Sequence, residues 1–385
     1  MSVLTLDNAR QMICELIALP TVNPMGREWS GATPIERPVT EYLERLFAPY
    51  GVRIERQAVS AMHENLLIVV PGWTDAPATL FESHMDTVPA DDWPDRAWTP
   101  RVEGDLVFGR GACDDKGCLA AMALAVLDLL ETGETPPAPV WFLAAGDEEY
   151  AQAGIIHFRE SGVPLGRGIF GEPTGLVPVV QHRGTLRWDI TIHGKSAHTA
   201  KRELGINAID GAVEVIVALR ELEASLQPRY PSQLTPGPAL TVSMIQGGRT
   251  RNAVPDACTL SVDFRLAPGM IWESALAETK AFLAKLPWQL THHAPQMTTP
   301  ALATDPDGAF SQAVLALCRK HGGAHLALGG MPYGTDASWV ADRIPALVLG
   351  PGDIAYAHAI DERISVSELL TCARLYRDIL TSSYD

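Results

Sequence analysis

The sequence predicts an α/β protein with a mostly parallel central sheet flanked by helices, into which a smaller α+β domain is inserted. Short apolar runs alternate with helical patterns in both terminal parts of the chain, which is typical of a parallel sheet covered by helices. Between residues 183 and 292 the predicted strands instead alternate polar and apolar residues. The α/β pattern then resumes, so we expect a discontinuous outer domain.

The α/β parts are expected to begin with an amphipathic helix over residues 4–18, with Asp7 as its N-cap. A run rich in Ala and Leu that ends at Gly133 predicts a second helix, over residues 116–131. Apolar or β-branched runs bounded by Pro and Gly predict strands. These runs are residues 65–70, 78–82, 139–145, 168–170 and 346–349.

The inserted segment has the order β-α-β-β-α with a last short strand, which suits a ferredoxin-like α+β sandwich. Its expected elements are a strand at 186–192, a helix at 207–225, strands at 240–245 and 258–265, a helix at 271–286 and a strand at 288–291. We therefore assign residues 1–182 and 293–385 to one domain and residues 183–292 to the inserted domain.

Composition excludes several classes of protein. A chain of 385 residues can bury a full core without disulfides. The net charge of -16 argues against binding to nucleic acid or to an anionic membrane, since both need a basic surface. The longest uncharged apolar stretch, Cys118–Leu127, is too short to span a bilayer. The six cysteines form no CxxC pair and no signal peptide is evident, so we expect a cytoplasmic protein with reduced, mostly buried thiols.

Polar and charged residues cluster directly after the predicted strands. His84 and Asp86 are two residues apart, so an extended segment points both to one side. Asp86 can then hold the imidazole of His84. Taken alone, such a pair is more often a surface hydrogen bond.

The second cluster is the glycine-rich loop GRGACDDKG, which contains Asp114 and Asp115. It does not suit a phosphate, because an acid stands where the third glycine of a dinucleotide-binding loop would be. Two adjacent carboxylates suit a hard cation better. The alternative is that Asp114 or Asp115 caps the following helix.

Three consecutive acids, Asp147 to Glu149, follow the buried strand 139–145, and burying them together without a cation is costly. A solvated acidic turn is the alternative. Glu172 and His358 also follow predicted strands. Ligands of open α/β sheets bind beyond the carboxyl ends of the strands, so these side chains are expected to converge. Their mixed N/O donors suit zinc, with manganese or cobalt as alternatives, and their number fits two metals.

The combination of motifs resembles the M20 metallopeptidases over nearly the whole chain, with acetylornithine deacetylase and succinyl-diaminopimelate desuccinylase the most similar members. The matching segments are SHMDTVP, GRGACDDKG, GDEE, GEPT, HGKSAHTAKRELGINAI, NAVPDACTLSVDFR and HAIDE. The run YAQAG after Glu149 and the HTA after Ala197 depart from the commoner family pattern.

The resemblance implies a centre of two zinc ions per subunit. It implies that His84 and Glu172 hold one metal, that Glu149 and His358 hold the other, and that Asp114 bridges them. Asp86 would orient His84, whereas Asp115 would not be a ligand. A metal-bridged water would attack the amide, with Glu148 as general base. A cis peptide bond is expected between Asp114 and Asp115.

The resemblance also implies that the inserted domain is a lid and dimerisation domain. His198 would steady the oxyanion in the partner's site of a homodimer, and Asn252 and Arg265 would meet a substrate carboxylate. Considered alone, His198 is more often a residue that caps the following helix, and Arg265 is more often a surface strand residue. The expected activity is hydrolysis of an N-acyl amino acid. A dipeptidase or carboxypeptidase, or a succinyl-diaminopimelate desuccinylase, is the alternative within the class, and a non-catalytic ligand-binding relative the alternative outside it.

Overall fold

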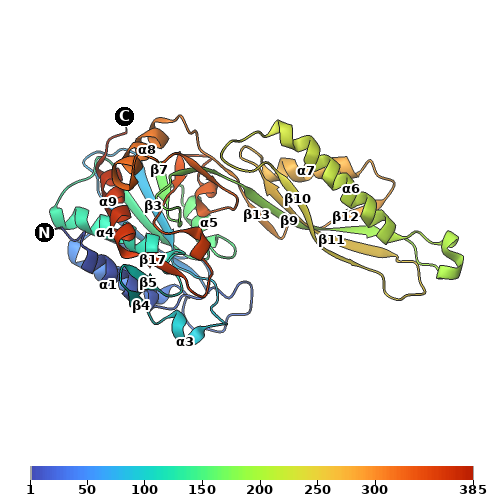
Figure 1. Cartoon of the computed structure of the whole chain (residues 1–385), viewed down its shortest axis with the longest axis horizontal. Coiled ribbons are helices and arrows are strands. Elements are labelled where there is room, and N and C mark those ends of the chain that lie inside the picture. Colours follow the sequence, from blue (N-terminus) through green and yellow to red (C-terminus); the bar gives the residue numbers. More distant parts are fainter. Residues whose placement is uncertain (1, 385) are drawn as a thin grey trace. The chain divides into compact units, whose positions relative to one another are not determined.

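The computed structural model describes residues 2–384. The chain forms two compact units (Figure 1). The first comprises the chain up to Val180 together with Thr304–Gly329 and the C-terminal part from Trp339 onward, and the second comprises Gln181–Ala303 and Gly330–Ser338. The assignment of residues 183–292 to a separate lid stays a prediction.

The first unit is built on a central sheet with the strand order β1-β2-β6-β3-β7-β16. Strand β3 pairs in parallel with both β6 and β7, and β16 continues the parallel set beside β7. The strands are β1 (Arg53–Ala58), β2 (Glu64–Val70), β3 (Ala78–His84), β6 (Val140–Ala145), β7 (Leu165–Phe170) and β16 (Ala346–Val348). The predicted mostly parallel sheet is thus confirmed, although β1 and β2 extend it antiparallel.

Helices cover both faces of this sheet. The chain steps in opposite directions across the sheet from β3 to β6 and from β6 to β7, so right-handed crossovers place helices α4 and α5 on opposite faces. Helix α4 packs on β3 and contacts α1 and α9, which lie with α8 on one side in Figure 1. The helices are α1 (Leu6–Ile17), α2 (Arg37–Phe47), α3 (Pro94–Ala97), α4 (Lys116–Thr132), α5 (Ala153–Glu160), α8 (Ala309–Gly322) and α9 (Val366–Thr381).

The predicted cap of α1 is wrong, and the alternative of a capping side chain at Asp115 is not found. Helix α1 is capped by Thr5, whose hydroxyl accepts the N–H of Asn8 at 3.2 Å, and Asp7 lies inside its first turn. A hydroxyl two residues before Asp7 is therefore the better-placed acceptor. Asp115 occupies the N-cap position of α4, but its side chain makes no capping hydrogen bond. The carboxylates of the DDKG segment are thus available for other partners.

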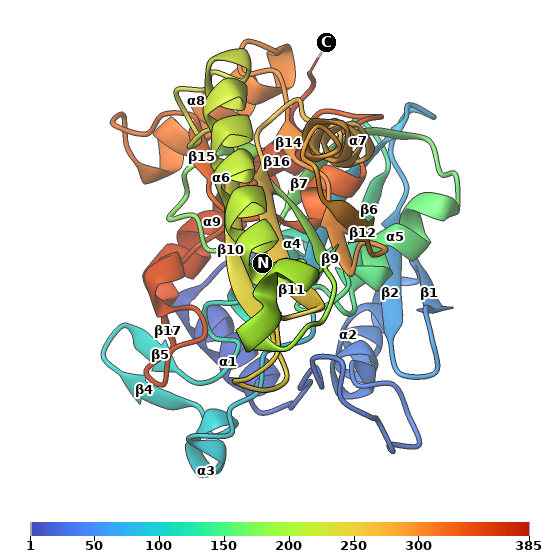
Figure 2. The ribbon, with the colours of Figure 1, turned by 90° about the vertical axis from the view of Figure 1, so that its right-hand side faces the viewer.

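The second unit has an antiparallel sheet with the order β10-β11-β9-β12, and β13 also pairs with β9. Helices α6 and α7 pack on this sheet around a core that includes Trp188, Ile190, Leu219 and Phe264 (Figure 2). The elements are β9 (Gly184–His193), α6 (Ala208–Leu226), β10 (Ala239–Gly247), β11 (Ala257–Leu266), α7 (Trp272–Leu283), β12 (Gln289–His292) and β13 (Met297–Thr299). The predicted α+β order is confirmed.

Smaller elements complete the fold. A three-stranded sheet has the order β17-β5-β4, and strand β8 contains the point where the chain leaves the first unit for the second. These strands are β4 (Arg101–Glu103), β5 (Leu106–Phe108), β8 (Val179–His182), β14 (Leu302–Ala303), β15 (Gly329–Met331) and β17 (Arg363–Ser365).

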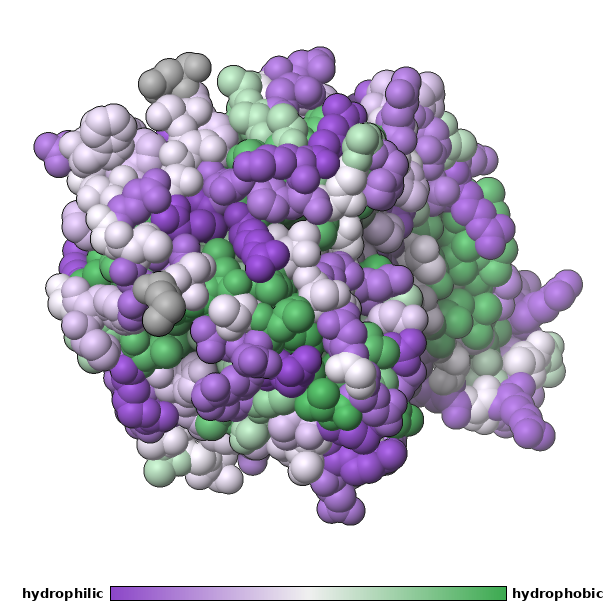
Figure 3. All heavy atoms as spheres, turned by 60° about the vertical axis from the view of Figure 1, so that its left-hand side comes forward, coloured by the Kyte–Doolittle hydropathy of each residue, from purple (hydrophilic) through white to green (hydrophobic). Residues whose placement is uncertain are grey.

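The surface is of mixed polarity. On the face that Figure 3 shows, hydrophobic side chains lie in patches between hydrophilic ones. No helix among residues 2–384 is both long and apolar enough to cross a bilayer. All six cysteines are free thiols, and five of them are buried, as expected.

Candidate metal centre

The first unit gathers acidic and imidazole side chains at the carboxyl ends of its parallel strands. His84 ends β3, Glu149 follows β6, Glu172 follows β7, and His358 lies in the segment after β16. Asp114 joins them from the turn before α4. His84, Asp114 and Glu149 bring one ligand atom each within 4.8 Å of the others, and His84, Glu148 and Glu172 do the same.

Asp114 lies between the two histidines. Its Oδ1 is 3.0 Å from Nε2 of His84, and its Oδ2 is 3.2 Å from Nε2 of His358. The same nitrogen of His358 is 3.3 Å from Oε2 of Glu149. The peptide bond between Asp114 and Asp115 is cis, as expected. One carboxylate thus presents a separate oxygen to each imidazole.

Glu362 holds the turn that carries Asp114. Its Oε1 accepts the backbone N–H groups of Cys113 and Asp114, each at 3.0 Å, and its other oxygen pairs with the buried Arg110. Asp115 points elsewhere, because its carboxylate accepts the hydroxyl of Ser83. The two neighbouring aspartates therefore have different surroundings.

The centre carries more negative charge than its two histidines balance. Burial, together with the charge of Asp114, raises the pKa of the Glu172 carboxyl well above its usual range. Hydrogen bonds that the ring donates to the carboxylates of Asp114 and Glu149 raise the pKa of His358 to about 10. The pKa of Glu149 is also raised by burial and by Asp114. Buried carboxylates that repel one another favour a bound cation.

Asp86 links the first histidine to the acidic turn after β6. Nδ1 of His84 is 3.0 Å from the backbone oxygen of Asp86 and 3.6 Å from its carboxylate. The carboxylate accepts the backbone N–H of Glu148 at 3.0 Å and that of Glu149 at 3.2 Å. Asp86 is fully buried, so it fixes the imidazole and the turn relative to each other.

Sequence reasoning missed three buried residues that extend this arrangement, namely Asn23, Glu36 and His63. Nδ2 of Asn23 lies 2.8 Å from Asp86 and 2.9 Å from Asp147. His63 lies between Glu36, at 2.7 Å, and Asp147, at 3.3 Å. No local spacing signals these contacts, since each joins segments more than 20 residues apart. Asp147 has a positive φ of 65°, which its buried partners maintain.

The residues fit a divalent metal centre. His84, His358 and the carboxylates of Asp114, Glu149 and Glu172 offer the imidazole and carboxylate donors that zinc accepts. Burial, followed by the charge of Asp114, raises the pKa of Glu172, and a bound cation would offset both effects on its carboxylate. Glu148 lies in the group with His84 and Glu172, so its position alone suits either a ligand or a neighbouring base.

The three candidates in the second unit have local partners. Nδ1 of His198 accepts the N–H of Ala200 at 3.1 Å, as a cap of the short helix Thr199–Leu204. Asn252 accepts the hydroxyl of Thr250 at 2.7 Å. Arg265, on β11, pairs with Asp263 at 2.8 Å. Their roles toward a substrate stay predictions.

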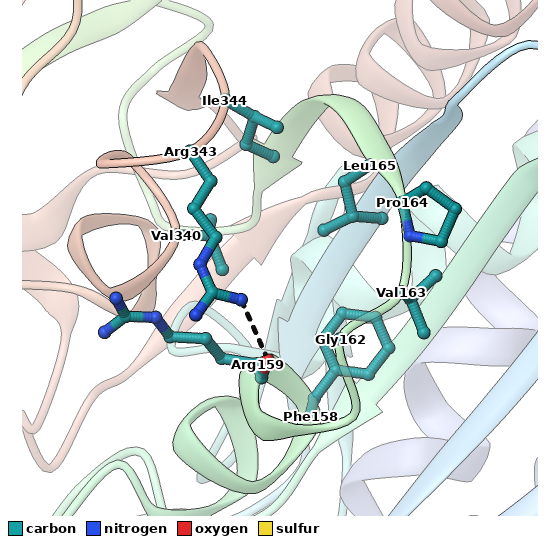
Figure 4. Close-up of a pocket in the computed structure, with 9 residues that line it drawn as sticks. All are labelled: Phe158, Arg159, Gly162, Val163, Pro164, Leu165, Val340, Arg343 and Ile344. Atoms are coloured by element: carbon teal, nitrogen blue, oxygen red, sulfur yellow. Dashed lines mark hydrogen bonds between the residues drawn. The ribbon is translucent and has the colours of Figure 1, made fainter.

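A separate hollow of about 250 Å³ lies beside α5 (Figure 4). Phe158, Leu165, Val340 and Ile344 line it together with Arg159 and Arg343. Nη1 of Arg343 donates to the backbone oxygen of Arg159 at 3.1 Å. No acid or histidine of the candidate centre lines this hollow, so it is distinct from the centre.

Comparison with known proteins assigns the chain to a family. Two curated relatives are acetylornithine deacetylases. The one from Pectobacterium atrosepticum is 29% identical over 374 residues, covering 95% of each chain. The one from Klebsiella pneumoniae is 31% identical over 325 residues, covering 82% of this chain and 83% of the relative.

Solved structures show the same fold. Aminopeptidase PepT from Bacillus cereus superposes with a TM-score of 0.78 at 20% identity, over 98% of each chain. A dinuclear metal binding peptidase of the M20 family from Bacillus subtilis gives 0.74 at 15% identity, over 98% of this chain and 97% of that one. The model of peptidase family M20/M25/M40 matches residues 80–382. The chain therefore belongs to peptidase family M20/M25/M40.

Proposed function

We propose that this chain is a two-metal hydrolase that cleaves the amide bond of an N-acyl amino acid, with acetylornithine deacetylase-like activity. Membership of the family makes it an M20 amidohydrolase or peptidase. One observation carries the proposal, namely the carboxylate of Asp114, which offers one oxygen to His84 and the other to His358. Such an arrangement suits a carboxylate shared by two metal ions.

The proposed ligands are His84 and Glu172 for one metal, Glu149 and His358 for the other, and Asp114 for both. The ions are proposed to be zinc, with cobalt or manganese as alternatives. When bound, they would supply Lewis-acid activation of water and of the scissile carbonyl. Asp115 is not among the proposed ligands, because its carboxylate is engaged by Ser83.

The remaining steps belong to side chains of the protein. Glu148 takes a proton from the attacking water and gives it to the leaving amine, a role worth about 10²–10⁴ in rate. Its backbone N–H is held by Asp86, which supports a fixed position for this base. His198 donates to the oxyanion, and Asn252 and Arg265 bind the substrate carboxylate. Local cations such as Arg265 are needed to attract an anionic substrate, because the chain carries a net charge of -16.

We also propose a homodimer formed through the second unit. Helix α6 exposes Val213 and Val217, at 55% and 47% exposure, and β10 exposes Met244 and Ile245, at 67% and 56%. Strand β10 is the first strand in the order of its sheet, so one edge is unpaired within the described chain. An apolar helix face beside an open strand edge is the kind of surface that a second copy covers.

The substrate class is tested with purified enzyme and a panel of N-acetyl amino acids, N-succinyl amino acids and dipeptides. The proposal predicts the highest kcat/KM for an N-acetyl amino acid with a free carboxylate. Methyl esters of the same substrates serve as matched controls, because they remove the charge that Arg265 would bind. Preference for dipeptides or for N-succinyl substrates would instead favour one of the alternatives within the class.

A further inference from the structure

The general base proposed above has a side-chain partner four residues further along the chain. Nε2 of Gln152 donates to Oε1 of Glu148 at 3.2 Å. Gln152 is 4% exposed and precedes helix α5, the helix that follows the acidic turn. Its backbone N–H donates to the carbonyl of Asp147 at 2.6 Å, which closes the turn.

Trp339 fixes the orientation of the Gln152 amide. Nε1 of Trp339 donates to Oε1 of Gln152 at 3.0 Å. An indole N–H can only donate, so it selects the carbonyl end of the amide. The NH₂ end then faces Glu148. Without the indole, the amide could rotate by 180° and present a second acceptor to the carboxylate.

The backbone at this position makes the side chain's role more specific. Gln152 has a φ of 55° and a ψ of 30°, in the left-handed region that favours glycine. A glutamine in this backbone conformation has a higher free energy than a glycine would have. Capping does not offset this cost, because the side chain of Gln152 makes no capping hydrogen bond to α5. Its side chain instead hydrogen-bonds to both Trp339 and Glu148.

We propose that Gln152, oriented by Trp339, is a positioning residue that holds the carboxylate of Glu148 in the rotamer required for proton transfer. This inference rests on the proposed role of Glu148 as the base. Neither Gln152 nor Trp339 is proposed to contact the substrate or a metal. Misplacement of a catalytic group slows the chemical step without weakening substrate binding, so we expect a lower kcat and an almost unchanged KM.

The test is a double-mutant cycle with Gln152→Leu, Trp339→Phe and the double variant, in the metal-loaded enzyme. Leucine is similar in size to Gln152, and its Cβ atom makes the left-handed backbone conformation similarly unfavourable. Phenylalanine removes the indole N–H. Each single variant is expected to lower kcat by about tenfold and to change KM by less than about twofold. The double variant is expected to match Gln152→Leu alone, because the indole acts only through the amide.

Trp141→Phe is the matched control. Trp141 packs against Phe158 of α5 with ring centroids 6.1 Å apart, so it reports any general disturbance of that helix. Its kcat is expected to be unchanged. A second readout needs no turnover: the indole N–H signal of Trp339 in the NMR spectrum is expected to shift in Gln152→Leu, whereas that of Trp141 is not.

Losses that add up in the double variant, or an unchanged kcat in Trp339→Phe, would overturn the proposal. Glu148→Gln is measured in parallel to separate this failure from failure of the proposed function. If Glu148→Gln keeps its metals and loses turnover while Gln152→Leu is normal, only the positioning role is wrong. If Glu148→Gln turns over normally or loses metal, the assignment of the base is wrong, and the positioning role falls with it.

Discussion

Oδ1 of Asp114 lies 3.0 Å from Nε2 of His84, which leaves Oδ2 of the same carboxylate facing a second imidazole. This contact joins the turn before α4 to the end of β3, two segments 30 residues apart. Both proposed metal positions therefore depend on the carboxylate of Asp114.

Removal of the shared carboxylate is expected to empty the centre. Asp114→Asn should lower bound zinc from about two ions per chain to less than one, because an amide is a poor metal ligand. Metal content of the purified variant, measured by atomic emission, checks this. Asp115→Asn is the matched control: its carboxyl is held by Ser83, burial raises its pKa to about 7, and an amide of the same shape should keep both metals. Equal zinc in the two variants would contradict the assignment.

The apolar face of the second unit is expected to hold two copies together. Val213→Glu places a charge on a 55% exposed side chain of α6 and should convert the dimer into a monomer. Light scattering after size-exclusion chromatography measures the mass, which is 41.6 kDa for one chain. Ile271→Glu is the control, since Ile271 is 64% exposed but lies just before α7. A monomeric wild type, or a dimeric Val213→Glu, would argue against this interface.

Complementation tests whether His198 acts in the partner's site. His198→Ala and Glu148→Ala subunits are each expected to be inactive. When they are mixed and allowed to exchange, about a quarter of wild-type activity should return, because about half the dimers are mixed and half of their sites have both residues. No recovery, after subunit exchange is verified by mass spectrometry of the mixed dimer, would place His198 in its own subunit's site or outside catalysis.

His182 is expected to make the second unit acid-sensitive. Burial lowers its pKa to about 4, and its Nε2 accepts the N–H and the hydroxyl of Thr335 at 3.3 and 3.1 Å. The unfolded chain binds a proton near pH 6.5, whereas the folded chain does not until about pH 4. Stability from this residue is therefore complete above pH 6.5 and decreases as the pH falls to 4, by about 1.4 kcal/mol per pH unit.

Urea unfolding between pH 7 and pH 4 measures this dependence. His182→Gln should show a flatter decrease in the free energy of unfolding than the wild type. His325→Gln, which changes an exposed histidine, should follow the wild type. Parallel curves for the wild type and His182→Gln would show that His182 does not cause the dependence.

Much of the fold could be predicted because its signals are local. The continuous apolar run before Glu148 predicted β6, and the Ala-rich run closed by Gly133 predicted α4, whose C-cap Gly133 has a φ of 68°. Strand β1 was missed because its sequence RIERQA is mostly polar, as befits the first strand in the sheet order. The wrong cap at Asp7 arose because Asp and Thr are both favoured N-cap residues and Asp7 lies only two residues after Thr5.

The convergence of His84, Glu149, Glu172 and His358 followed from one topological rule, that parallel strands end at the same edge, whereas Asp114 joins them from the turn before α4. The buried partners of the acidic turn did not follow from any rule of that kind. Asn23 comes from the segment after α1, and His63 precedes β2. Their contacts depend on packing between distant segments, for which a single sequence carries no periodicity.

The most direct test of the proposed mechanism is metal content and turnover measured on the same sample of Glu148→Gln. We predict two metal ions per chain, as in the wild type, and a loss of kcat of about 10²–10⁴, because Glu148 is a base and not a ligand. Glu149→Gln, one residue away, should instead lose metal. Loss of metal from Glu148→Gln with retention in Glu149→Gln, or wild-type turnover in Glu148→Gln, would contradict the account.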